Sequence, residues 1–126
     1  MSLALLFLAA CADQVTITPG QGACTDYDPA DPAESTVESD ISKDGSARVW
    51  RSNALREQTG LIFDPVIEVG GDIVSVFEAW TGGETDDALC YEPIVSFQGV
   101  TRDLQVRWYL QEGDPAPFDS VDIEAP

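Results

Sequence analysis

Apolar and polar residues alternate in short runs along most of this chain, and the alternation predicts β-strands. The clearest run is 104–110, where the apolar positions are Leu104, Val106, Trp108 and Leu110. A period of two is the pattern of a strand that buries one face and leaves the other in water. Residues 121–125 repeat the pattern, so we expect a second strand of this kind over residues 120–125.

Further short apolar runs are bounded by turn residues, as is typical of small sheet proteins. They lie at 37–41, 47–50, 66–69, 73–80 and 94–97. Gly70-Gly71-Asp72 and Lys43-Asp44-Gly45 have the composition of hairpin turns. Residues 52–58 predict one or two turns of helix, opened by a Ser or Asn cap and ended near Gly60.

The number and spacing of these runs predict an all-β fold. About seven short strands in roughly ninety residues are typical of a small antiparallel β-sandwich, with an immunoglobulin-like architecture as the default. The marks of a true immunoglobulin domain are missing. Trp50 lies too far after Cys24, and Ala88 stands two residues before Cys90, where a tyrosine would be expected. We therefore predict the architecture and not the family.

Composition divides the chain into three parts. Residues 1–10 are uncharged and largely apolar, whereas residues 36–126 carry most of the strand pattern and form the expected sandwich domain. The part between them, 11–35, is polar, acidic and interrupted by proline and glycine, which predicts a tether. Within the tether, only residues 15–17 have the composition of a short strand.

The first part ends in Leu8-Ala9-Ala10-Cys11, after an apolar run that begins at Leu3. This run is too short for a helix that crosses a bilayer, which takes about 20 residues. Small residues before a cysteine, at the end of an apolar run, are typical of a processing site. The alternative is that residues 3–10 form a buried strand of the domain.

These four residues resemble the lipobox of bacterial lipoprotein precursors. In that family the leader is cut before the cysteine, and the cysteine then carries the lipid that anchors the protein. The resemblance implies that residues 1–10 are a signal peptide and that Cys11 is the lipidation site of a cell-envelope protein. In the enterobacterial pattern, an aspartate directly after the cysteine favours the inner membrane. Ala12 stands there, so the resemblance implies the outer membrane.

The cysteine count fits this interpretation. The chain has three cysteines, and an odd cysteine in an exported protein needs an explanation, which lipidation of Cys11 supplies. Cys24 and Cys90 then remain as a pair in an oxidising compartment, and we expect a disulfide between them. The alternative is two free buried thiols. A zinc site is not expected, because the spacing is wrong and the chain has no histidine.

The charge balance is strongly acidic. The chain of 126 residues has 23 acidic and 6 basic residues, a net charge of −17. Such a surface repels nucleic acids and anionic lipid headgroups, so neither is an expected partner. It favours solubility, cation binding or basic partners. The alternative is that the charge is an adaptation to a salty or crowded exterior.

Residue types also restrict the chemistry. Without histidine, mechanisms that use an imidazole base are excluded. We find no nucleophile elbow around a serine and no glycine-rich phosphate loop. A small carboxylate-dependent hydrolase remains compatible with the residue types, but we expect that the protein is not an enzyme and has no organic cofactor.

Two acidic clusters suggest a calcium site, because calcium takes six to eight oxygen ligands. The clusters are Asp26, Asp28 and Asp31 in one loop and Glu84, Asp86 and Asp87 in the other. The expected disulfide would bring the two loops together. The alternative is that both are solvated acidic loops.

Aromatic residues provide a second candidate binding site, since exposed rings beside polar groups can hold sugars or protein partners. The candidates are Trp50, Arg107 and Tyr109. The sequence thus predicts a lipid-anchored envelope protein whose sandwich is a non-enzymatic binding module with a protein or glycan partner. A small hydrolase and a passive structural component are the alternatives.

Overall fold

A computed structural model describes residues 6–10, 13–24 and 34–126 of the chain. These residues form strands, turns and loops and no helix, so none of them belongs to a helix that could cross a membrane. The strands are β1 (Leu6–Ala10), β2 (Asp13–Ala23), β3 (Val37–Ile41), β4 (Ala47–Arg51), β5 (Ala54–Arg56), β6 (Thr59–Phe63), β7 (Val66–Gly70), β8 (Ile73–Phe77), β9 (Trp80–Thr85), β10 (Leu89–Gln98), β11 (Leu104–Tyr109) and β12 (Asp119–Ile123). The all-β prediction is confirmed.

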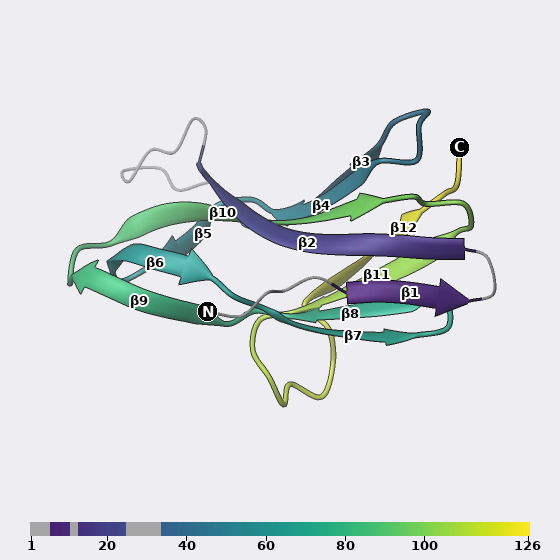
Figure 1. Ribbon diagram of the computed structural model, residues 1–126. Coiled ribbons are helices and arrows are strands. Elements are labelled where there is room, and N and C mark those ends of the chain that lie inside the picture. The colour runs from purple at the N-terminus through teal and green to yellow at the C-terminus, as the bar shows by residue number, and fades with distance from the viewer. Residues whose placement is uncertain (1–5, 11–12, 25–33) are drawn as a thin grey trace.

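Two sheets face each other in a small sandwich (Figure 1). The first has the order β1-β2-β10-β4-β3 and is antiparallel, with β5 paired to the start of β10. The second has the order β12-β11-β8-β7, and its β8–β11 pair is parallel. A two-stranded sheet of β6 and β9 extends one end of the sandwich. The predicted sandwich is therefore confirmed, with one parallel pair inside it.

The core lies between the facing sheets and follows the period-two pattern of the sequence. Leu104, Val106 and Trp108 are buried on the inner face of β11, while the alternating residues of that strand are half-exposed. Inner residues of β8, β10, β4 and β2 complete the core, among them Val74, Val76, Val95, Phe97, Val49, Val15 and Ile17. Removal of this apolar surface from water is the main force that holds the two sheets together.

The prediction of a helix over residues 52–58 is wrong. Ser52 and Asn53 form a turn, with Asn53 in the left-handed region at φ 53°, and β5 follows. Ala54 pairs with Tyr91 of β10 and is fully buried. Pairing with a neighbouring strand thus outweighs the weak helix signal of a short segment.

The prediction of a tether over 11–35 is wrong for residues 13–23. They form β2, which pairs with β10 from Gln98↔Thr16 to Tyr91↔Ala23. Val15 and Ile17 are part of the core. Residues 25–33 of the predicted tether lie outside the described residues. The sandwich domain therefore includes β2 and is not confined to residues 36–126.

The strand β1 lies at the edge of the first sheet. Its residues pair with Asp13–Ile17 of β2, from Leu6↔Ile17 to Ala10↔Asp13. Cys11 lies outside the described residues, so its lipidation stays a prediction.

The predicted disulfide is confirmed. Cys24 and Cys90 are bonded, and their Cα atoms are 5.6 Å apart. The bond joins the end of β2 to the start of β10, at the end of the sandwich where β5, β6 and β9 lie (Figure 1). Closing a loop of this length stabilises the folded state by about 4 kcal/mol in the chain-entropy account.

Side chains of the first sheet hold the β6–β9 sheet in place, because they form hydrogen bonds with the backbone in and just before β6. The Tyr91 hydroxyl donates a hydrogen bond to the Gln58 carbonyl at 2.8 Å and accepts one from the Leu61 N–H at 3.2 Å. It thus fills the β-bulge of β6 between Thr59 and Leu61. The Gln21 side-chain amide pairs with the next part of the same strand, on Leu61 and Phe63.

Candidate binding groove

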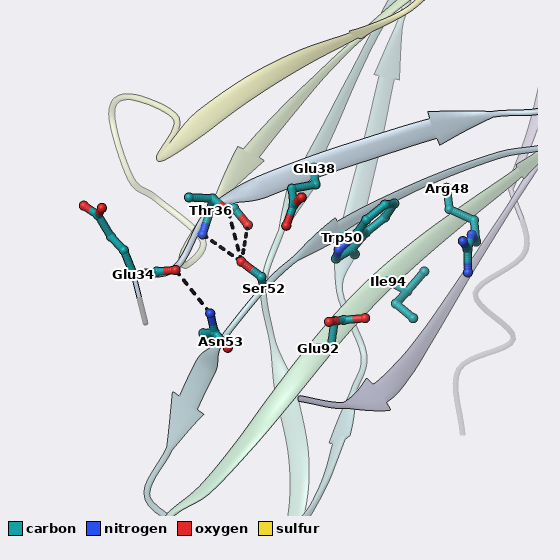
Figure 2. Close-up of a pocket in the computed structure, with 9 residues that line it drawn as sticks. All are labelled: Glu34, Thr36, Glu38, Arg48, Trp50, Ser52, Asn53, Glu92 and Ile94. Carbon is teal, nitrogen blue, oxygen red and sulfur yellow. Dashed lines mark hydrogen bonds between the residues drawn. The ribbon is translucent and has the colours of Figure 1, made fainter. Parts of the chain in front are cut away.

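An open groove of about 480 Å³ lies on the outer face of the first sheet (Figure 2). Its lining residues come from β3, β4 and β10 and from the segments next to β3 and β4. They are Glu34, Thr36, Glu38, Arg48, Trp50, Ser52, Asn53, Glu92 and Ile94. Trp50, one of the predicted binding residues, lies in its middle.

Strand register brings the central residues of the groove together. Glu38 of β3 is the cross-strand partner of Trp50, and Trp50 is the partner of Ile94 in β10. Directly paired residues of antiparallel strands project on the same face. Because Val49 and Arg51 point inward and are buried, Trp50 between them must point outward. The indole is therefore half-exposed between a carboxylate and an isoleucine.

One end of the groove is fixed by hydrogen bonds between the segment before β3 and the turn after β4. The Ser52 N–H donates to the Thr36 carbonyl at 2.8 Å, and the Thr36 N–H donates to the Ser52 hydroxyl at 3.1 Å. The Asn53 side-chain amide donates to the Glu34 carbonyl at 3.2 Å. The left-handed conformation of Asn53 suits an asparagine better than most residues. These bonds keep the wall of the groove in place without any ligand.

Arg48 lies across the other side of the groove. Its guanidinium carbon is 5.5 Å from the centre of the Trp50 ring, which is a cation–π distance. The same guanidinium donates to a carboxylate oxygen of Asp40 at 2.8 Å. This hydrogen bond, with the charge of Asp40, raises the pKa of Arg48 above its ordinary value. The side chains of Arg48 and Asp40 are 57% and 50% exposed, so the ion pair itself is weakly held.

The balance of charge in the groove is negative. Glu34, Glu38 and Glu92 line it, and Arg48 is the only cation among the described residues that do so. An aromatic face beside carboxylates is a suitable environment for a cation, because both the ring quadrupole and the carboxylates attract positive charge. The arrangement can also hold a sugar ring on the indole, with the carboxylates accepting hydrogen bonds from hydroxyls.

A buried ion pair fixes the strand that carries Trp50. The Arg51 guanidinium forms two hydrogen bonds with the Glu78 carboxylate, one of them from Nη2 to Oε1 at 2.9 Å. Glu78 also accepts hydrogen bonds from the indole N–H groups of Trp108, at 2.6 Å, and Trp80, at 3.3 Å. The pair thus connects β4 with β11 and β9, across the sandwich. Sequence reasoning missed Glu78. The only sign of it in the sequence was a lone charged residue inside the apolar run 73–80.

A second hollow, of about 850 Å³, lies at the disulfide end of the sandwich. Trp80 forms part of its lining, and the Arg56 guanidinium carbon lies 5.5 Å from the centre of the indole ring. The ring itself packs on Phe63 and Tyr91. This packing makes Trp80 mainly a structural residue.

The predicted aromatic site is divided between two faces. Arg107 and Tyr109 lie on the outer face of the second sheet, because Trp108 between them is buried. The Tyr109 ring stacks on Phe77 at 4.4 Å, and the Arg107 Nε donates to the Gln105 side chain at 2.9 Å. Trp50 lies on the opposite sheet. These three residues therefore do not form one site.

The structure describes only half of the predicted calcium site. Asp26, Asp28 and Asp31 lie outside the described residues. Asp86 accepts a hydrogen bond from the Gln58 amide at 3.3 Å, and Asp87 accepts one from the Thr85 hydroxyl at 3.0 Å. Within 6–10, 13–24 and 34–126, no three potential metal ligands are grouped. The described half, which also contains Glu84, therefore does not form a metal site by itself.

Comparisons with protein-family models, with curated proteins and with solved structures found no match to this chain. Its function is therefore inferred from the geometry of the groove.

Proposed function

We propose that this protein is a lipid-anchored lipoprotein of the cell envelope and that its sandwich is a non-enzymatic binding module. The observation that carries the proposal is the half-exposed Trp50 ring in an open groove lined by three carboxylates. Aromatic side chains that are partly exposed and surrounded by polar groups are typical anchors for a ligand or partner.

The rigidity of the groove supports binding. Trp50, Glu38 and Ile94 occupy consecutive strands of one sheet, and hydrogen bonds fix the end of the groove at Ser52 and Asn53. Strand positions vary little, so a ligand meets groups that are already in place and the entropic cost of binding is lower. The groove is also broad and open, which suits the recognition of a surface or an extended chain.

The anchor is supported by the sequence and by the disulfide. Leu8-Ala9-Ala10-Cys11 resembles a lipobox, and the Cys24–Cys90 bond is of the kind that persists outside a reducing cytosol. With the anchor on Cys11, the groove would be presented at the surface of a membrane. An outer-membrane position is part of the same proposal.

Binding at the groove is tested with arrays of glycans and peptides, probed with the wild-type protein and two variants. Trp50→Ala removes the ring from the groove, and Tyr109→Ala removes a ring from the opposite sheet. We expect at least one ligand that the wild type and the Tyr109 variant bind and the Trp50 variant loses. If every ligand survives Trp50→Ala, the groove is not the binding site.

The anchor is tested by labelling cells of a bacterial host with radioactive palmitate. We expect label on the wild-type protein and none on a Cys11→Ser variant. Equal labelling of the two proteins, or no label on either, would contradict the lipoprotein proposal.

A further inference from the structure

We propose that the ligand of the Trp50 groove is a lysine or arginine side chain on a basic segment of a partner protein, and that Arg48 is an internal competitor which this side chain displaces. The inference rests on the proposed function, because it assumes that the groove binds a ligand. It adds the chemical class of the ligand. It also gives the contact between Arg48 and Trp50 a role, which is to block the groove until a ligand binds.

The first support is the guanidinium already present on the ring. Arg48 lies 5.5 Å from the centre of the Trp50 ring and makes an ion pair with Asp40. The chain thus places one of its own few cations against the indole and a carboxylate. A guanidinium or ammonium group from a partner can make the same two interactions in the same place, since both depend only on positive charge and planar or compact shape.

The second support is charge complementarity. Glu34, Glu38 and Glu92 line the groove, whereas Arg48 is the one positive group that the described part of the chain contributes to it. With Arg48 displaced, the charged residues that line the groove would all be carboxylates. The whole chain carries a net charge of −17, so a basic segment is also attracted from a distance.

The third support is that Arg48 can move. More than half of its side chain is exposed, and so is half of the side chain of Asp40. An exposed ion pair of this kind is worth little and is exchanged easily. In contrast, Arg51 on the inner face of the same strand is buried and bonded to Glu78, so a ligand cannot displace it.

The fourth support is a free approach to the groove from the side of β2. Gly20 and Gly22 are the β2 partners of Ile94 and Glu92. A side chain on Gly20 would meet nothing within 4 Å, and one on Gly22 would meet only the end of Ile94 at 3.9 Å. Among the residues that the structure describes, no side chain therefore walls the groove on that side, and an extended peptide can lie across Ile94 to reach Trp50.

The test measures binding of fluorescein-labelled hexaarginine and hexalysine by anisotropy, with hexaglutamate as the negative control. Three variants are compared with the wild type. Trp50→Ala removes the ring, and Arg48→Gln removes the competitor. Arg107→Gln, on the opposite sheet, makes the same change in net charge as Arg48→Gln without touching the groove. Circular dichroism melts confirm that each variant is folded.

We expect the cationic peptides to bind the wild type and hexaglutamate not to bind. Because an exposed cation–π contact contributes modestly, Arg48→Gln should tighten cationic binding by about 3-fold to 5-fold, and Trp50→Ala should weaken it by a similar factor or more. Arg107→Gln should change binding by less than about 2-fold, since its charge is distant and screened.

Equal tightening by Arg48→Gln and Arg107→Gln would overturn the inference, because net charge alone would then explain binding. Cationic binding that is indifferent to Trp50→Ala would also overturn it. If the cationic peptides do not bind while a glycan on the arrays binds through Trp50, the inference fails and the proposed function stands. If no ligand depends on Trp50, both fail.

Discussion

The Arg51–Glu78 pair makes a specific prediction about stability. Glu78 is 3% exposed and accepts hydrogen bonds from Arg51, Trp108 and Trp80. Replacement of Glu78 by glutamine keeps the size and one acceptor oxygen but removes the charge. The Arg51 guanidinium is then left inside the protein without a counter-ion.

The expected loss is large. Removing one partner of a buried ion pair typically costs about 3–5 kcal/mol, because the other charge stays buried and uncompensated. The Arg51 side chain is 10% exposed, so water can reach it in part and we expect Glu78→Gln to cost about 3 kcal/mol. Small domains have about 5–15 kcal/mol of stability in total, so this would be a substantial fraction.

The assay is urea unfolding of the disulfide-bonded protein, followed by tryptophan fluorescence and circular dichroism. Arg51→Met, Glu78→Gln and the double variant complete a mutant cycle. We expect the double variant to be more stable than the sum of the single losses predicts, with a coupling above about 1 kcal/mol. Arg48→Gln, on the exposed face of the same strand, is the control and should change stability by less than about 0.5 kcal/mol.

Two results would refute this reasoning. A loss below about 1 kcal/mol for Glu78→Gln would mean that Arg51 finds water or another partner without cost. Additive single losses would mean that the two side chains do not stabilise each other, whatever their distance.

Three further predictions concern other contacts. Tyr91→Phe removes the hydroxyl that fills the β6 bulge and should cost about 1–3 kcal/mol in urea unfolding, because two backbone groups lose their partner; a loss under about 0.5 kcal/mol would contradict this. A Cys24→Ser/Cys90→Ser double variant should lose about 4 kcal/mol by the same assay, and an unchanged midpoint would exclude a structural role for the bond. Hydrogen bonds from Ser42 and the Ser46 N–H lower the pKa of Asp44 from 3.8, so its stabilising effect is present above that pH and is lost as the pH falls through the lowered value. The difference in melting temperature between the wild type and Asp44→Asn should therefore narrow below pH 3.8, and a difference that widens there would contradict the assignment.

The strands could be predicted where the sequence alternates over a sufficient length. The alternation over residues 104–110 correctly predicted the buried face of β11 as far as Trp108. Leu110 was assigned to the same face, but it lies beyond the strand and is exposed. The strand β2 was recognised only at residues 15–17. Pro19, Gly20 and Gly22 in its second half are turn-formers in most contexts, and only pairing with β10 keeps them extended.

The groove was harder to predict than the fold. Trp50 was identified as a candidate because an exposed aromatic ring beside polar groups can hold a sugar or a protein partner. Glu38 and Glu92 were missed, since nothing local indicates that β3, β4 and β10 are neighbours in this register. Local patterns give the face on which a side chain lies, whereas its neighbours depend on strand order, which is a property of the whole chain.

The position of β2 has a consequence for how the protein would sit in the envelope. Because β2 begins at Asp13, only Ala12 would separate a lipid-bearing Cys11 from the folded domain, a span of at most about 7 Å. With so short a connection to its lipid, the anchored domain would have almost no freedom to rotate relative to the bilayer. The disulfide end would then face away from the lipid, because it lies at the opposite end of β2 from Asp13 (Figure 1). The outer face of the first sheet, which carries Trp50, would stand upright on the membrane plane. Partners would then have to approach along the membrane surface. The length of the sandwich would set the height of the groove above that surface.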